Sequence, residues 1–465
     1  MADSGGFGKR AQRFGRYGIL FDRESSATSA SLRPEIFPIS PSPDPMKSLP
    51  RAALLSLVMT ASFVLTANAQ EWTRFRGPNG TGISTAKGVP VTWDENGFAW
   101  RVPIAGASHS QPVAWGDRLF LLTALDNGKE RAIICVRKSD GKELWQKSYP
   151  LPMARPGNKN SGYANTSPVV DAERVVACFV SNDHFWVRAF DHAGKELWSR
   201  DLGTFAAQHG HGASPMIYEG NVIVTNDQDG ASSVVSLDAR TGAVVWKSPR
   251  ASGLNPNIAA AYCTPITHQR ADGTVELLLT SQSHGVSSID VRTGAFNWDS
   301  PVFDKRMVAS AIVAGDLAIG SCGSGAGTGN YLSAIKLGGK GDVGKTHVAY
   351  TLRRATPYVP TPLFHEGRLY LISDAGFASA IEAATGKEIW SERLPRAEFF
   401  SSPVLIDGKI YCASTKGEMI VLATGDTFKE LGRSSLGEGT HSTPCVDGGR
   451  IYVKTFTHLV CIAGK

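Results

Sequence analysis

The chain has 465 residues, of which 42% are hydrophobic and 19% are charged, and its formal net charge is +6. This composition is ordinary for a globular protein. The small net charge gives no basic surface of the kind that nucleic-acid-binding proteins carry, so we expect no nucleic-acid partner.

Residues 1–45 mix Arg, Ser and Pro without an apolar period. They precede a segment that looks like a signal peptide, and such a signal rarely carries so long a leader. We interpret residues 1–45 as a non-native leader, with Met46 as the real start of the protein. A genuine disordered extension is the alternative.

Residues 46–69 have the features of a secretory signal peptide. A positively charged start is followed by an apolar run over 52–65, and Ala67-Asn68-Ala69 supplies the small residues that a signal peptidase needs. The run is too short for a comfortable membrane span. We expect cleavage before Gln70 and a periplasmic or secreted protein without a membrane span. Because Gln70 is not a cysteine, we expect no lipid anchor.

After a lead-in segment, residues 70–94, a turn ending in tryptophan repeats along the chain. In Asp238-Ala-Arg-Thr-Gly-Ala-Val-Val-Trp246, for example, a glycine lies four residues before the tryptophan. A period of about 40–50 residues is typical of propellers and solenoids. The spacing is doubled before the last copy, so one repeat has lost its tryptophan. The repeated tryptophans are Trp145, Trp198, Trp246, Trp298 and Trp390.

A second marker, a Ser or Thr near a proline, precedes an apolar run, a glycine turn and another apolar run. One further copy, residues 309–320, lacks the proline, which makes eight copies. Each copy holds four short strands, A to D, as in a propeller blade. We therefore expect residues 95–465 to form an all-β, eight-bladed β-propeller of four-stranded antiparallel blades. The marker prolines are Pro112, Pro168, Pro215, Pro265, Pro362, Pro403 and Pro444.

The eighth copy, residues 443–462, lacks a strand D, whereas the segment 98–103 has no strands A to C ahead of it. We expect this N-terminal strand to complete the last blade and close the ring. Closure would also hide sheet edges that invite aggregation.

The seven cysteines are spread over the repeats, and most lie inside apolar runs. Their number is odd, and none is adjacent to another. We expect most of them to be buried free thiols that act as small hydrophobic residues.

The pattern A-x-D-x-x-T-G-x-x-x-W after S-x-P resembles the repeats of pyrroloquinoline-quinone (PQQ) dehydrogenase-like propellers. The resemblance covers about residues 95–463, and it is specific for fold and weak for function. Eight such blades occur in quinoprotein alcohol dehydrogenases and in the lipoprotein scaffold of the outer-membrane assembly machine. The opening 71–82 is similar to exported PQQ-like proteins of planctomycete-type bacteria.

For the enzymes, the resemblance implies PQQ above a calcium ion held by Glu, Asn and Asp, an Asp base, and a disulfide of adjacent cysteines. This chain has no adjacent cysteines, and its acidic residues do not match the metal motif one by one. We therefore assign no catalytic residues and expect an exported, non-enzymatic binding or scaffold propeller. A PQQ- and calcium-dependent periplasmic dehydrogenase is the alternative.

The best candidate site is formed by residues just before the strand-A prolines, because equivalent positions in a ring point at one axis. We expect a polar sector beside an apolar wall that includes Val359 and Phe400, a combination common in small-molecule sites. The partner would be an unidentified protein or small molecule at the channel mouth, bound by a monomer. The polar candidates are His109, Asn165, His211, Tyr262 and His441.

A more specific hypothesis is that His109, His211 and His441 form a metal site, since histidine is a common metal ligand. The alternative is that these histidines cap the inner strands and contact only water in the channel.

Overall fold

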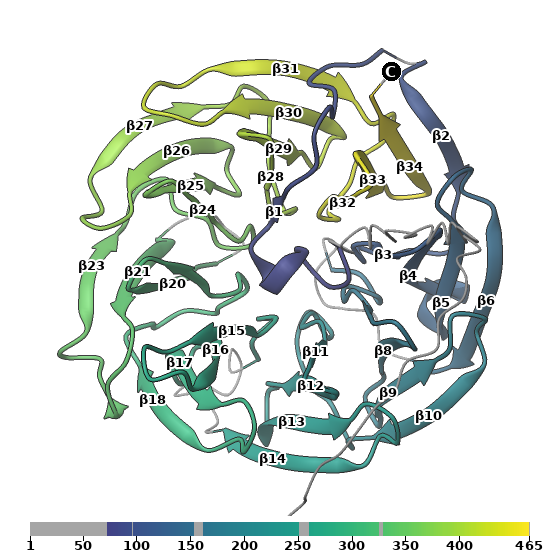
Figure 1. Cartoon of the computed structure of the whole chain (residues 1–465), viewed down its shortest axis with the longest axis horizontal. Helices are drawn as coiled ribbons and strands as arrows, with labels where there is room; N and C mark the ends of the chain where they lie inside the picture. Colours follow the sequence, from purple (N-terminus) through teal and green to yellow (C-terminus); the bar gives the residue numbers. More distant parts are fainter. Residues whose placement is uncertain (1–71, 95, 153–160, 251–259, 325–328, 465) are drawn as a thin grey trace, which may run out of the picture. The chain divides into compact units, whose positions relative to one another are not determined.

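The structure is a computed structural model, and it describes residues 72–94, 96–152, 161–250, 260–324 and 329–464. The described residues form eight sheets arranged around an axis as the blades of a β-propeller (Figure 1). Each blade contains four antiparallel strands, the shortest of which lies innermost. The eight-bladed fold predicted from the repeats is confirmed.

From the inner to the outer strand, blades 1 to 3 contain β3 (Val113–Trp115), β4 (Arg118–Leu125), β5 (Glu130–Arg137) and β6 (Glu143–Pro150); β7 (Val169–Val170), β8 (Val175–Val180), β9 (Phe185–Phe190) and β10 (Glu196–Asp201); and β11 (Met216–Tyr218), β12 (Asn221–Asn226), β13 (Ser232–Asp238) and β14 (Val244–Arg250). In the same order, blades 4 and 5 contain β15 (Ile266–Gln269), β16 (Val275–Ser281), β17 (Gly285–Asp290) and β18 (Phe296–Ser300); and β19 (Ile312–Ala314), β20 (Leu317–Cys322), β21 (Tyr331–Lys336) and β23 (Val348–Leu352). Blades 6 to 8 contain β24 (Leu363–His365), β25 (Arg368–Ile372), β26 (Phe377–Glu382) and β27 (Glu388–Arg393); β28 (Val404–Ile406), β29 (Lys409–Ala413), β30 (Glu418–Ala423) and β31 (Glu430–Ser435); and β32 (Cys445–Asp447), β33 (Arg450–Lys454), β34 (His458–Ala463) and β2 (Phe98–Pro103).

Strand β2 is the outer strand of blade 8 and closes the ring. It pairs antiparallel with β34, and Trp100 lies opposite Cys461 (Figure 1). The closure predicted from the missing eighth outer strand is therefore confirmed. Two very short strands, β1 (Ile83–Ser84) and β22 (Gly341–Asp342), extend blades 7 and 4 by parallel pairing. The 3-10 turns η1 (Pro78–Gly80) and η2 (Asp126–Gly128) complete the assigned elements.

The repeated turn joins neighbouring blades. In blade 3, the Asp238 carboxylate accepts hydrogen bonds from the backbone N–H and the hydroxyl of Thr241, both at 2.7 Å. The turn then places Gly242 at φ +69°, where side chains are disfavoured. The ring of Trp198, from blade 2, packs on this glycine, and its Nε1–H donates to the carbonyl of Ala239 at 2.8 Å. The glycine and the tryptophan of the repeat are therefore interblade contacts.

The same contact recurs around the ring, and it explains the missing tryptophan. In blade 5 the equivalent outer-strand residue is Tyr350, whose ring packs on Gly386 of blade 6. Its hydroxyl donates to the carbonyl of Ala383 at 2.7 Å, as an indole N–H does elsewhere. Tyrosine replaces tryptophan here and keeps the contact. The tryptophan pairs are Trp100–Gly141, Trp145–Gly194, Trp198–Gly242 and Trp246–Gly294.

The Ser/Thr marker forms a second set of interblade contacts, at the inner strands. The residue one position before each strand-A proline donates its backbone N–H to the hydroxyl of the equivalent Ser or Thr in the next blade, at 2.9–3.1 Å. We call this series the hydroxyl belt. Its pairs are Gln111–Ser167, Ser167–Ser214, Ser214–Thr264, Thr264–Ser310, Ser310–Thr361, Thr361–Ser402 and Ser402–Thr443.

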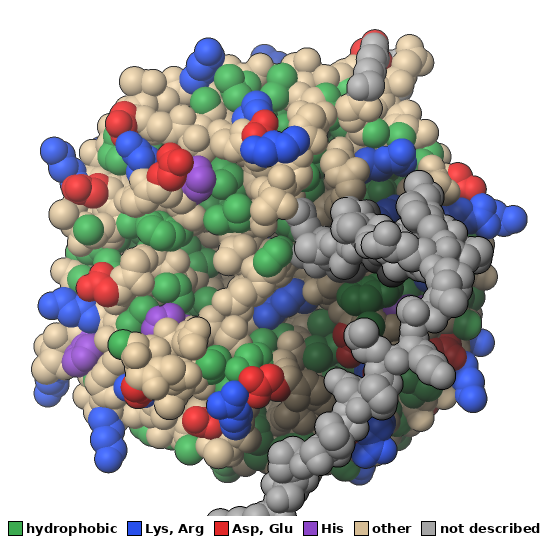
Figure 2. Space-filling model, viewed as in Figure 1, with side chains coloured by type: hydrophobic (Ala, Val, Ile, Leu, Met, Phe, Trp, Pro, Cys, Tyr) green, Lys and Arg blue, Asp and Glu red, His purple; other side chains and the backbone are tan. Residues whose placement is uncertain are grey.

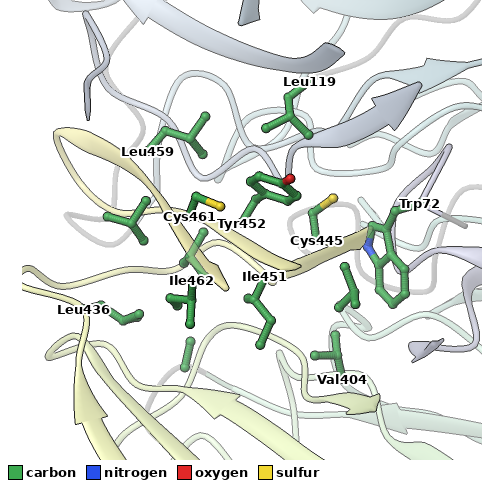
Figure 3. Packing of buried hydrophobic residues seen from close by; sticks show 14 of the residues in the cluster. Trp72, Leu119, Val404, Leu436, Cys445, Ile451, Tyr452, Leu459, Cys461 and Ile462 are labelled. Carbon is green, nitrogen blue, oxygen red and sulfur yellow. The ribbon is translucent and has the colours of Figure 1, made fainter. Parts of the chain in front are cut away.

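The segment 72–82, which we call the plug, crosses the middle of the ring (Figure 1). Arg76 is fully buried, and its guanidinium donates to backbone carbonyls of inner-strand residues, including Thr361 at 3.0 Å and Pro362 at 2.8 Å. Gln111, the belt residue that is neither Ser nor Thr, accepts the N–H of Arg76 at 2.8 Å. Trp72 is fully buried beside Cys445 and Val404 (Figure 3). The sequence repeats did not predict this plug.

All seven cysteines lie in the described ranges, and each is buried and free. The proposed leader, residues 1–45, and the signal peptide, residues 46–69, lie outside the described residues and stay predictions.

We expect Gly242→Ala to destabilise the protein, because its Cβ would lie 2.5 Å from Cε3 of Trp198. Gly220→Ala is the matched control: its φ is +76° and a Cβ there would meet nothing within 4 Å. Backbone strain should lower the free energy of unfolding of both variants by about 1–2 kcal/mol. Crowding of the indole should lower that of Gly242→Ala by about 1–3 kcal/mol more. Urea unfolding measures both, and equal stability of the two variants would contradict the contact.

Candidate functional site

A cavity of about 580 Å³ lies on the axis of the propeller, where the chain enters the inner strands. Phe75 of the plug lines it. Because the plug also spans the inner strands, we interpret the cavity as closed at its base by the plug rather than as an open channel. Its volume is within the range of small-molecule sites.

Each blade contributes the residue three positions before its strand-A proline, or the equivalent position in blade 5. We count positions back from this proline. In an extended segment the side chains at positions −3 and −1 point to the same side of the chain, so the hydroxyl belt at −1 fixes the direction of the side chain at −3. The eight residues are His109, Asn165, Gly212, Tyr262, Val308, Val359, Phe400 and His441.

His109 and His441 form an aromatic group with neighbouring rings. Their ring centroids lie 4.5 Å apart, and His441 lies 4.8 Å from Phe400 and 5.2 Å from Phe456 in edge-to-face contacts. Burial, assisted by His441 and Lys454, lowers the pKa of His109 to about 3. His109 is therefore neutral at physiological pH and can donate or accept a hydrogen bond.

The expectation that His211 faces the same cavity needs correction. His211 lies at position −4, and successive side chains of an extended segment point in opposite directions. It packs between Phe185 and Phe205, at centroid distances of 4.5 and 5.2 Å. Burial lowers its pKa to about 4. Position −3 of this blade is Gly212, where a Cβ would lie 2.8 Å from the Tyr262 ring.

His209 and Arg306 form a polar group that also lines the cavity. The Arg306 guanidinium donates to Nε2 of His209 at 2.9 Å and to the side-chain oxygen of Gln208 at 2.7 Å. Because Nε2 accepts, the neutral His209 ring carries its proton on Nδ1 and donates to Ser161 Oγ at 2.7 Å. Arg306 precedes blade 5, whose copy lacks the proline marker, so no motif pointed to it.

Asp374 contributes a carboxylate to the cavity lining, from the turn between β25 and β26. It accepts backbone N–H groups of Tyr358 at 2.6 Å and Val359 at 3.1 Å. Burial raises its pKa to about 6. Asp374 thus fixes the loop that carries part of the apolar wall.

Residues 91–328 and 326–462 match the model of a PQQ-repeat family described as "Outer membrane protein assembly factor BamB". The chain belongs to this family. Outer membrane protein assembly factor BamB of Moranella endobia (strain PCIT) is 23% identical over 312 residues, which are 64% of this chain and 75% of the relative.

Two solved structures have the same fold. BamB from Moraxella catarrhalis matches with a TM-score of 0.53 and 16% identity over 78% of this chain and 96% of its own. A europium-containing methanol dehydrogenase matches with a TM-score of 0.63 and 12% identity over 83% of this chain and 90% of its own. At these identities the structures show the shared fold alone.

The axial cavity of this BamB-like propeller does not offer the donor set that calcium and PQQ need. Calcium takes six to eight oxygen ligands. Among the described residues, the carboxylates lining the cavity are Asp374, which already accepts two amides, and the exposed Glu398. No cysteine is among the described lining residues. Within the described ranges, no three His, Cys, Asp or Glu residues cluster closely enough to hold a metal ion, so His109, His211 and His441 do not form a triad.

On the face seen in Figure 2, acidic and basic side chains are interspersed around the rim rather than gathered in one patch. Among the described residues, no helix has the length and apolar character to cross a membrane.

We expect Asp374→Asn to change the pH dependence of stability. With a pKa of about 6 in the folded state against 3.8 in the unfolded state, Asp374 holds its proton more tightly when folded. The native protein therefore loses stability from this group as the pH rises from about 4 to 6. The asparagine cannot titrate. The free energy of unfolding of Asp374→Asn minus that of the native protein should therefore increase by about 1–3 kcal/mol as the pH rises across this window.

Urea unfolding at a series of pH values measures this difference. The loss of one amide hydrogen bond in Asp374→Asn adds a constant offset that does not change with pH. A difference that stays flat between pH 4 and 6 would show that Asp374 titrates as an ordinary carboxyl.

Proposed function

We propose that this chain is an exported, non-enzymatic binding propeller of the BamB-like family, and that its ligand or partner segment occupies the axial cavity. The lining of that cavity carries the proposal. One side offers the hydrogen-bonding groups of Tyr262, His209 and Arg306, and the other side offers Val359 and Phe400. Convergent polar groups beside an apolar wall are typical of binding sites.

Family membership supports the non-enzymatic interpretation. The relative from Moranella endobia and one of the solved structures are BamB proteins, and the family is that of an outer-membrane protein assembly factor. For this chain we propose the same class of function, the binding of another molecule by a rigid ring. The identity of that molecule, a protein segment or a small compound, is left open by the cavity.

The second candidate is a PQQ- and calcium-dependent dehydrogenase. Its support is the fold that this chain shares with the methanol dehydrogenase, at a TM-score of 0.63 and 12% identity. The lining of the axial cavity argues against it. Asp374 already accepts two backbone amides, and burial favours its neutral form, whereas a calcium ligand is ionised.

Titration with PQQ and calcium separates the two functions. We expect no stoichiometric change in the PQQ absorption spectrum and no dye-linked alcohol oxidation, with a quinoprotein alcohol dehydrogenase as the positive control. A tight one-to-one complex that oxidises alcohols would replace our proposal. Val308→Trp is the control for location, because a bulky side chain at this lining position should abolish binding in the cavity but not adsorption elsewhere.

Export makes a separate prediction about processing. We expect the native protein to begin at Gln70 and to be found outside the cytoplasm, because Ala67-Asn68-Ala69 fits signal peptidase. Intact-mass measurement and N-terminal sequencing of the native protein check this. A native chain that keeps residues 1–45 would contradict both the cleavage and the assignment of Met46 as the start.

A further inference from the structure

The base of the axial cavity is lined by hydroxyl groups of the belt. Four successive belt residues, on blades 5 to 8, line the cavity, and all four side chains are buried. They lie at position −1, next to the inner strands that hold the plug, and therefore deeper than the residues at position −3. We call their side-chain groups the floor hydroxyls. They belong to Ser310, Thr361, Ser402 and Thr443.

Each floor hydroxyl has a proton to donate. Its oxygen already accepts a backbone N–H from the preceding blade, as Thr361 does from Ser310 at 3.1 Å. A hydroxyl also carries one donor, yet none of the four donates to a protein group in the described part of the chain. Because these side chains are buried in the ring and line the cavity, the acceptor for their protons has to come from what the cavity contains.

Two buried arginines of the plug make the base of the cavity positive. Arg74 and Arg76 flank Phe75, and their exposed fractions are 6% and 0%. Arg76 donates only to backbone carbonyls, and Arg74 donates to the carbonyl of Pro265 and to the sulfur of Met216. Among the described residues, no carboxylate lies close enough to compensate either charge, and burial lowers their pKa values to about 10 and about 9, so both stay charged at neutral pH. Such uncompensated charges favour an anion in a neighbouring cavity with walls of low dielectric constant.

The mouth of the cavity has the opposite sign. Asp374 lies in the turn between β25 and β26, and Glu398 is exposed five positions before Pro403. Arg306, at the corresponding level in blade 5, offsets one of these two negative charges. The remaining charge would repel a second carboxylate of a ligand at the mouth, so the lining favours one carboxylate directed to the base.

We propose that the axial cavity binds a ligand with a single carboxylate beside an apolar or aromatic group. The carboxylate accepts hydrogen bonds from the floor hydroxyls, and the apolar part packs against Val359 and Phe400. This inference rests on the proposed function, because it names the chemistry of the ligand in the same cavity. A small organic acid and the C-terminus of a protein chain share this chemistry. PQQ, which carries three carboxylates, does not.

Crystals of the native protein soaked in para-bromobenzoate test the location and the orientation together. We expect the carboxylate within hydrogen-bond distance of at least one floor hydroxyl, and an anomalous bromine peak on the side of the mouth. The reverse orientation, or bromine only outside the cavity, would overturn the proposal. This measurement needs no variant.

Calorimetric titration with para-bromobenzoate and the neutral para-bromobenzamide tests the role of the charge in solution. We expect the amide to bind about tenfold more weakly or less, because hydrogen bonds to a charged group are the stronger ones. Equal affinities that Val308→Trp abolishes would overturn the carboxylate inference and still support binding in the axial cavity. Acid binding that Val308→Trp leaves unchanged would contradict the proposed function as well. If neither compound binds at about 10 mM, well above a weak Kd of about 1 mM, the carboxylate inference is wrong.

A matched pair of variants tests the floor hydroxyls. Thr361→Val removes both a belt bond and a floor hydroxyl, and it should reduce the preference for the acid over the amide about tenfold. Thr264→Val also removes a belt bond, but Thr264 is not among the described lining residues, so the preference should persist. An equal loss of preference in both variants would show that the belt acts only on the shape of the ring. If Thr361→Val does not fold, the orientation of para-bromobenzoate in native crystals decides the question.

A tripeptide with a C-terminal leucine distinguishes the two sources of the carboxylate. Tighter binding of this peptide than of para-bromobenzoate supports the C-terminus of a protein chain, and weaker binding supports a small organic acid. In either case, amidation of the peptide should weaken its binding about tenfold, as for the benzoate. A peptide that binds equally well with and without its terminal charge would contradict the proposal.

Discussion

The hydroxyl belt is the constraint on which the site depends. Between successive blades, one hydrogen bond from a backbone N–H to a Ser or Thr side chain joins one inner strand to the next. Each bond contributes only about 1 kcal/mol to stability. Its larger effect is geometric, because it holds the extended chain before the inner strand in one register. Residues far apart in sequence, such as Asn165 and Phe400, therefore face one cavity.

Gln111 is the exception that connects this belt to the plug. A serine there would only continue the pattern, whereas glutamine reaches both the N–H of Arg76 and the carbonyl of Pro444, at 2.8 and 2.6 Å. The seam between blades 8 and 1 is thus fastened through the same residue that anchors the plug. The axial cavity, the plug and the closure of the ring are parts of one hydrogen-bonded arrangement.

The repeats made most of the fold predictable. A glycine turn, a tryptophan and a Ser-Pro marker recur in most blades, so their spacing gave the number of blades and revealed the strand at 98–103. The same register placed His109, Tyr262 and His441 at the axis. His211 was placed wrongly because a shift of one residue reverses the direction of a side chain in an extended segment.

Other parts of the site carry no repeated signal. Arg306 precedes the one copy without a proline, and Asp374 comes from a turn that the markers do not reach. The plug is held chiefly by backbone carbonyls, as Arg76 shows, and carbonyls are the same for every sequence. Contacts of this kind depend on the assembled ring and leave no pattern in the sequence.

The pairing of β2 with β34 has a consequence for how the molecule is made. Trp100 and Cys461 lie opposite each other although almost the whole propeller separates them in sequence. As the chain emerges into the compartment where it folds, β2 comes long before β34 and must wait for it before it finds its partner. Contacts between such distant segments form slowly, and waiting strands are prone to wrong pairings. The inner belt and the tryptophan contacts can meanwhile form between successive blades, so the ring should grow blade by blade and seal last at the seam.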